Sequence, residues 1–90
     1  MSSTKRKPAK QVWYVYMLEC ADGTIYTGIT NNVKERIAKH NSGKGAKYTR
    51  ARLPVVLKAK WKHTSKSEAA KAEYAFKQLS RAEKMNLIMC

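Results

Sequence analysis

The sequence predicts an α/β (α+β) domain in which a small, three-stranded, mainly antiparallel sheet is flanked by helices, in the order ββαβαα. Three observations predict this fold. Two segments rich in β-branched and aromatic residues flank a turn signal, a third strand-like segment alternates with lysines, and two segments of helical spacing begin with capping pairs. The chain of 90 residues has room for one domain. We expect residues 1–11 to form a flexible basic tail and residues 12–90 to form the domain.

The first two strands are expected at Val12–Glu19 and Thr24–Thr30, joined by the turn Ala21–Gly23. A three-residue loop with a left-handed glycine introduces a bulge and places Tyr16 and Tyr26 on the same face of the hairpin. A two-residue turn would place the two rings on opposite faces. The prediction is therefore a positive φ at the glycine and a shared face for the two tyrosines.

The first helix is expected to begin after Asn32, because a glutamate three residues later completes a capping box. Val33 and Ile37 supply its apolar stripe, and the run Asn41–Gly43 ends it. The stretch Gly43–Arg52 is expected to be a loop. Two glycines around a lysine at its start suggest a phosphate cradle, but the spacing of a Walker motif is absent, which excludes an ATP site.

The third strand is expected at Val55–Trp61, where apolar residues alternate with lysines, so one face should be buried and the other basic. A second capping box at Ser65 predicts a helix over residues 66–79, with an apolar face that includes Phe76. A short final helix is expected at Arg81–Met89. These elements complete the predicted order.

The chain is strongly basic, with 19 Lys and Arg against 6 Asp and Glu and a formal net charge of +13. Eleven of the cations lie in residues 34–66, where Glu35 is the single acidic residue. Clustered cations with interspersed small and aromatic residues are typical of proteins that bind a phosphate backbone, so nucleic acid is the expected partner. A solvated lysine-rich surface is the plainer alternative.

Several other classes of protein are excluded. No apolar stretch is long enough for a membrane helix, and the apolar run Val12–Cys20 lacks the cleavage site of a signal peptide. Two cysteines cannot form a disulfide framework, and no Cys or His spacing matches a zinc site. We therefore expect an intracellular domain that is not secreted and has neither a membrane partner nor a nucleotide cofactor.

A few residues are not explained by packing alone. Glu73 borders the apolar stripe of its helix, where a carboxylate needs a partner, and on pattern alone an ion pair with Lys77 is the simpler interpretation. Arg36 and His40 share one helix face, four residues apart. Gly28 lies inside a strand, which indicates a bulge or the close approach of another group.

Taken together, these positions resemble the GIY-YIG nuclease superfamily, and in particular its small stand-alone, single-domain branch. The two characteristic triplets would be Tyr14-Val15-Tyr16 and Tyr26-Thr27-Gly28. Tyr14 stands where the family has a glycine, and Thr27 stands where it has an aliphatic residue. The segment Asn41–Arg50 closely resembles a stretch typical of the stand-alone branch. The resemblance covers residues 13–88.

The resemblance also supplies the remaining site residues. Arg36 follows Tyr26 by ten residues and His40 follows four residues later, as in many family members. Glu73 falls where the family carries its metal-binding glutamate. The resemblance therefore implies a metal-dependent endonuclease that hydrolyses phosphodiester bonds in DNA, with branched, nicked or single-stranded DNA as the expected substrates. DNA is expected as the partner ahead of RNA.

Each residue has an expected role in that chemistry. Glu73 would hold one divalent ion, expected to be Mg²⁺, and Arg36 would neutralise charge that develops on the phosphoryl oxygens. Tyr26 would position the attacking water and take its proton, and Tyr16 and His40 would orient Tyr26. The residues expected to grip the nucleic acid are Lys44, Lys47, Tyr48 and Arg50.

Two alternatives stay open. A catalytically silent module could bind DNA or RNA on the same fold, although a pure binder has no need of a carboxylate facing an anionic ligand. Attachment to an anionic membrane ranks last, because the chain lacks a basic amphipathic helix with bulky apolar anchors.

Overall fold

The structure is a computed structural model of the chain, and it describes residues 12–89, so the expected basic tail at residues 1–11 lies outside the described part. The elements are β2 (Trp13–Glu19), β3 (Ile25–Thr30), α1 (Val33–Asn41), α2 (Lys47–Arg50), β4 (Val56–His63), α3 (Lys66–Lys77) and α4 (Arg81–Met89). The predicted α+β class and the order ββαβαα are confirmed. The one-turn helix α2 is an addition, because it lies in the stretch that was expected to be a loop.

The first hairpin forms as its turn residues predict. Gly23 has φ of +84° and donates its backbone N–H to the Cys20 carbonyl at 2.9 Å, and the Cys20 N–H donates to the Thr24 carbonyl at 2.8 Å. These bonds enclose a three-residue loop with a left-handed glycine, which offsets the strands by a bulge. The register then pairs Tyr16 with Gly28, so Tyr16 and Tyr26 lie on one face of the sheet.

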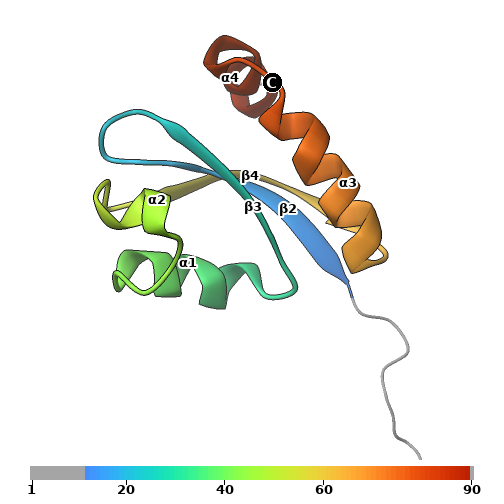
Figure 1. Cartoon of the computed structure of the whole chain (residues 1–90), viewed down its shortest axis with the longest axis horizontal. Coiled ribbons are helices and arrows are strands. Elements are labelled where there is room, and N and C mark those ends of the chain that lie inside the picture. The colour runs from blue at the N-terminus through green and yellow to red at the C-terminus, as the bar shows by residue number, and fades with distance from the viewer. Residues whose placement is uncertain (1–11, 90) are drawn as a thin grey trace, which may run out of the picture.

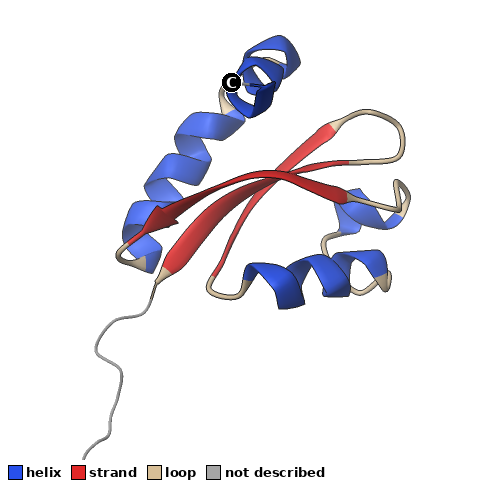
Figure 2. Ribbon diagram, turned by 180° about the vertical axis from the view of Figure 1, so that it is seen from behind, coloured by secondary structure: helices blue, strands red, loops and turns tan. Residues whose placement is uncertain are grey.

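The three strands form an antiparallel sheet in the order β3-β2-β4, so β2 is central and β3 and β4 are edges. Helices α1 and α2 lie on one side of the sheet and α3 lies on the other, as Figures 1 and 2 show from opposite directions. Helix α3 packs against all three strands. The functional consequence is that side chains from α1 and α3 approach the edge strand β3 from different faces.

Strand β4 departs from the expected pattern of one buried face and one basic face. In the pairing of β2 with β4, Met17 lies opposite Ala59 but the next residue, Leu18, lies opposite Leu57. One residue of β4 is therefore unpaired and forms a bulge. The bulge sends Leu57 to the face of α1 and Trp61 to the face of α3, where its ring lies 4.7 Å from that of Phe76. The predicted alternation is confirmed, because Leu57, Ala59 and Trp61 are half-buried between exposed lysines. The bulge distributes these apolar residues over both faces, so the prediction that they share one face was wrong.

Capping side chains fix where the helices begin. Asn32 accepts the Glu35 N–H at 3.1 Å before α1, and Ser65 accepts the Glu68 N–H at 3.1 Å before α3, so both predicted caps are confirmed. Helix α4 has a reciprocal capping box with Ser80, whose backbone N–H donates to the Glu83 carboxylate at 2.8 Å. This cap separates α3 from α4, and α3 ends at Lys77, two residues before its expected end.

The core is small and is centred on β2, where Val15, Tyr16, Met17 and Leu18 are at most 1% exposed. Asn41 joins α1 to the start of β4, because its side-chain amide accepts the Val55 N–H at 2.8 Å and donates to the Val55 carbonyl at 3.1 Å. Among residues 12–89, no helix has the length and apolar character that crossing a membrane requires.

Candidate active site

Three aromatic rings meet on the face of the sheet that carries α1. Tyr16 comes from β2, Tyr26 from β3 and His40 from the last turn of α1. The two tyrosine rings have centroids 6.3 Å apart, and the His40 ring lies 6.0 Å from Tyr16 and 5.3 Å from Tyr26. The predicted shared face is confirmed, and the structure adds His40 as the ring that both tyrosines contact.

Two glycines leave room for this cluster. A Cβ on Gly28 would lie 2.6 Å from the hydroxyl oxygen of Tyr16, so only a residue without a side chain lets that hydroxyl reach over β3. A Cβ on Gly45 would overlap the ring of His40 and lie 2.8 Å from its Cα. The predicted close approach at Gly28 is therefore explained by Tyr16, and the glycine at 45 serves His40.

The buried imidazole of His40 makes hydrogen bonds through both ring nitrogens. Its Nε2 lies 3.0 Å from the Tyr16 hydroxyl and its Nδ1 lies 2.9 Å from the Thr49 hydroxyl oxygen. Thr49 donates its own proton to the Ala46 carbonyl at 2.9 Å, so it accepts from Nδ1–H, and the bare Nε2 accepts from Tyr16. The Ala46 N–H lies farther from Nδ1, at 3.4 Å, so the shorter bonds decide the tautomer.

The electrostatic environment agrees with these proton positions. Burial raises the pKa of Tyr16, the nearby Tyr26 and Glu73 raise it further, and a hydrogen bond and the positive charge of Arg36 act against the rise. Burial also lowers the pKa of His40, and the charge of Arg36 lowers it further. Tyr16 is therefore a neutral hydroxyl donor and His40 a neutral acceptor near pH 7.

Arg36 is the cation of the cluster. It lies one helical turn before His40 on α1 and is half-buried. Its Nε atom is buried and has no hydrogen-bond partner within residues 12–89. Buried guanidinium donors are normally paired, so an open one beside Tyr16 and His40 is suited to an anion that arrives from outside.

Tyr48 extends the cluster outward from α2. Its ring stacks on Tyr26 with centroids 5.9 Å apart and an interplanar angle of 26°, and it is 40% exposed. Arg52 lies over the Tyr48 ring at 4.1 Å, donates to the Tyr48 carbonyl at 2.7 Å and pairs with Asp22 of the hairpin turn at 3.0 Å. Arg52 thus ties the hairpin to α2 and holds Tyr48 against Tyr26.

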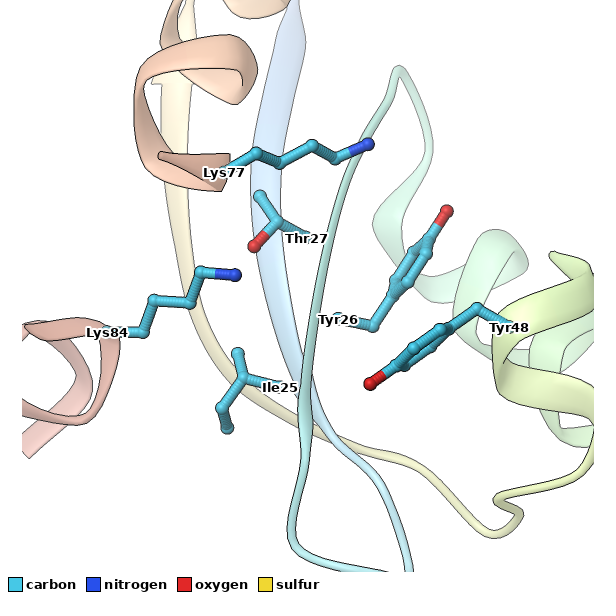
Figure 3. A pocket seen from close by; sticks show the side chains of 6 residues that line it. All are labelled: Ile25, Tyr26, Thr27, Tyr48, Lys77 and Lys84. Carbon is cyan, nitrogen blue, oxygen red and sulfur yellow. The ribbon is translucent and has the colours of Figure 1, made fainter. Parts of the chain in front are cut away.

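A hollow of about 370 Å³ opens along the edge strand β3. Figure 3 shows β3 running between Tyr26 and Tyr48 on one side and Lys77 and Lys84 on the other. Ile25 and Thr27 complete the lining. The hollow therefore joins the aromatic cluster to the end of α3 and the start of α4 across the edge of the sheet.

Glu73 approaches from the α3 side of the sheet. Its carboxylate is 24% exposed and pairs with the Lys77 ammonium at 3.4 Å, which is the simpler interpretation of its position in the sequence. Its negative charge nevertheless acts on Tyr16, whose pKa it helps to raise. The structure therefore relates Glu73 to the tyrosines by charge and places it on the opposite face of the sheet from His40.

The donor set around Glu73 suits a weakly held divalent ion. In proteins Mg²⁺ commonly takes one or two carboxylates and completes its shell with waters and substrate phosphates. Glu73 offers one partly exposed carboxylate, and no group of three His, Cys, Asp or Glu side chains gathers anywhere in residues 12–89. The residues present thus fit an ion that relies on a bound phosphate for further ligands.

The other residues that the sequence indicated for nucleic acid lie around α2. Lys44, Lys47 and Arg50 are exposed, in the same segment that carries Tyr48. Sequence reasoning missed Thr49, Arg52 and Lys84, and it named Lys77 only as an ion-pair partner of Glu73. The spacing of Thr49 from His40 carries no general signal, whereas the position of Lys77 one helical turn after Glu73 did indicate their ion pair.

Comparisons with known proteins agree with this arrangement. Residues 12–86 match the family model of the GIY-YIG catalytic domain. A UPF0213 protein of Halobacterium salinarum is 58% identical over 71 residues, covering 79% of this chain and 92% of that protein. A UPF0213 protein of Streptococcus agalactiae is 57% identical over 75 residues, covering 83% of this chain and 85% of that protein.

Two solved structures share the fold. The solution NMR structure of a UPF0213 protein from Bacillus halodurans is 55% identical, with a TM-score of 0.56 over 87% of this chain and 83% of that one. The solution NMR structure of a protein from E. faecalis is 40% identical, with a TM-score of 0.58 over 94% of this chain and 88% of that one.

Proposed function

Because the chain belongs to the GIY-YIG family, whose domain is of nuclease type, we propose that it is a metal-dependent endonuclease that hydrolyses phosphodiester bonds in DNA. Branched, nicked and single-stranded DNA are the proposed substrates, inside the cell where DNA is found. The observation that carries the proposal is the cluster of Tyr16, Tyr26 and His40 beside an Arg36 with an open buried donor.

The residues of the chain divide the work of phosphodiester hydrolysis. Arg36 binds a phosphoryl oxygen through its open Nε–H and neutralises the charge that develops there. Tyr26, which stands between the buried cluster and the hollow, positions the attacking water and takes its proton. Tyr16 is fixed by its hydrogen bond to His40, and its ring packs against the ring of Tyr26 and orients it.

Glu73 is the proposed ligand of the divalent ion, expected to be Mg²⁺. When bound, such an ion polarises the scissile phosphate and stabilises the leaving oxygen. In the free protein the Glu73 carboxylate is paired with Lys77, so it is already neutralised without the ion. Lys44, Lys47, Tyr48 and Arg50 are proposed to hold the strand next to this site, with their charges in the solvent and the Tyr48 ring on Tyr26.

A second function is favoured by one specific observation. The pairing of Glu73 with Lys77 satisfies the carboxylate within its own helix, as expected of a structural ion pair. A catalytically silent module that binds DNA or RNA needs no more than that. The two functions share the basic surface and differ in whether the bound strand is cut.

Incubation of the protein with branched, nicked, single-stranded and duplex DNA, and with matched RNA, tests the proposal. Each substrate is given with Mg²⁺ and with a chelator, and Tyr26→Phe serves as the matched variant because it keeps the ring and removes the hydroxyl. We expect cleavage of at least one DNA with Mg²⁺ and none with the chelator or with Tyr26→Phe. Binding without cleavage of any substrate would leave the silent module as the function.

A further inference from the structure

The hollow along β3 has a second wall that no step above uses. On the α3 side of the strand it is lined by Lys77 and Lys84, which come from the last turn of α3 and the first turns of α4. Figure 3 shows both lysine side chains extending toward β3 from the side opposite Tyr26 and Tyr48. Both ammonium groups line one hollow, so an anion bound there would be attracted to both.

The charge balance of this wall supports an anionic ligand. Lys77 is compensated by Glu73 at 3.4 Å, and its side chain is 49% exposed, so one of its faces remains open to solvent. Lys84 is half-buried at the other end of the wall. The net charge of Glu73, Lys77 and Lys84 is positive, which favours a singly charged anion such as a phosphodiester.

A buried hydroxyl adds an independent observation. Thr27 is 2% exposed, and its Oγ1 is buried without a hydrogen-bond partner within residues 12–89. In Figure 3 this oxygen points to the lysine side of β3. A buried hydroxyl left unpaired costs free energy, and a valine of the same shape would avoid that cost. The position is explained if the hydroxyl donates to a ligand in the hollow.

We propose that Lys77, Lys84 and Thr27 form a phosphate subsite that receives a backbone phosphate adjacent to the scissile one. The strand then crosses the edge of β3, with one nucleotide against the aromatic wall of Tyr26 and Tyr48 and the neighbouring phosphate against the lysine wall. This inference rests on the proposed function and adds a binding surface outside the basic segment around α2.

Binding in the absence of catalysis tests the subsite. The probe is fluorescein-labelled oligothymidine, and its Kd is measured by fluorescence anisotropy with a chelator over a series of salt concentrations. Lys84→Gln and Lys77→Gln should each weaken binding about fivefold and reduce the magnitude of the salt slope by about 0.7, the value for one neutralised phosphate of a single strand. Lys84→Gln is the cleaner variant because Lys77→Gln also breaks the pair with Glu73.

Matched controls separate the subsite from a general reduction in positive charge. Lys71→Gln removes one lysine of α3 that is 74% exposed and paired with Glu68, away from the hollow, and should leave the slope unchanged. Thr27→Val should weaken binding while the folded protein becomes at least as stable as the parent, because the free protein has no hydrogen bond there to lose and the valine avoids the cost of an unpaired buried hydroxyl.

The outcomes distinguish this inference from the proposed function. The subsite would be overturned if three variants kept the affinity and the salt slope of the parent, whether or not the parent cleaves DNA with Mg²⁺. These variants are Lys84→Gln, Lys77→Gln and Thr27→Val. Weakened binding in these variants supports the subsite even if no substrate is cut, in which case only the nuclease assignment fails.

Discussion

The hydroxyl of Tyr16 donates to Nε2 of His40 over 3.0 Å, and the two side chains are 1% and 0% exposed. This bond joins the central strand to α1 inside the protein. Because both groups are neutral and both are buried, the bond keeps its strength without the desolvation penalty of an ion pair. Tyr16, His40 and Thr49 therefore form a buried, uncharged hydrogen-bond relay that stabilises the site.

Removing the far end of that relay should destabilise the fold. Thr49→Val keeps the shape and leaves Nδ1–H of His40 without an acceptor, so we expect a loss of about 1–3 kcal/mol in the free energy of unfolding. Urea denaturation measures it. Ser42→Ala removes an exposed hydroxyl that donates to the Lys39 carbonyl and should cost far less. Equal losses in the two variants would mean that the relay is not structural.

The neutral imidazole makes stability depend on pH. The folded pKa of His40 is lowered, so below about pH 6.5, the unfolded value, the unfolded chain binds more protons than the folded one. The contribution of the neutral His40 to the free energy of unfolding is fully present above that pH. It decreases as the pH falls, by at most about 1.4 kcal/mol per pH unit for this one group. Urea midpoints of the parent and His40→Gln, measured through this range, check the expectation.

The variant should show a shallower pH dependence than the parent, because the titrating group has gone. A parental slope in His40→Gln would assign the effect to other groups.

A side chain at position 28 should push against Tyr16. The added Cβ of Gly28→Ala would lie 2.6 Å from the Tyr16 hydroxyl, so we expect destabilisation of about 1–3 kcal/mol and loss of cleavage. In the Tyr16→Phe background that oxygen is absent, and the same glycine substitution should cost less. A double-mutant cycle on unfolding free energies measures this coupling, and additive losses would contradict the close approach.

The charge of Glu73 should matter for cutting and little for folding. Glu73→Gln breaks a partly exposed helix pair with Lys77, which contributes on the order of 0.5 kcal/mol, so the variant should fold and bind DNA as the parent does. Cleavage with Mg²⁺ should fall by several orders of magnitude. Thermal midpoint, binding and cleavage are measured on one preparation, and full cleavage by the variant would remove Glu73 from the site.

The basic segment around α2 should control affinity for every sequence. Neutralising Lys44, Lys47 and Arg50 together should weaken binding and lower the magnitude of the salt slope by about 0.7–0.9 for each phosphate that these residues no longer neutralise. Lys58, Lys60 and Lys62 of β4 are equally exposed and serve as the comparison set. If only the β4 set changes the slope, the binding surface lies on that strand.

The sequence was sufficient to predict the turn and the helix starts that depend on residues close together in the chain. The loop Ala21–Gly23 predicted the register that brings Tyr16 and Tyr26 to one face, and Asn32 and Ser65 predicted two helix starts. In each case a turn or cap acts within a few residues, so its consequence can be read from the chain itself.

The remaining features depend on contacts between distant segments. The bulge in β4 places apolar residues of this strand on both faces of the sheet. The strict alternation of apolar residues and lysines in the sequence gives no sign of it. The relay from His40 to Thr49 depends on how the loop after α1 folds back, and α2 forms within that loop. The lysine wall appears only when the fold brings Lys77 and Lys84 to the hollow along β3, because neither residue departs from an ordinary surface pattern in the sequence.

The central position of β2 has a consequence for synthesis on the ribosome. Strand β2 pairs with β3 along one edge, but its other edge waits for β4, and the carbonyl of Gly23 waits for Arg81, which donates to it from 58 residues farther along. The cationic stretch at residues 34–66 emerges before Glu73 does. A nascent chain thus carries its charge for polyanions before it carries the carboxylate, and a cutting centre that needs Glu73 is incomplete until that residue has left the exit tunnel.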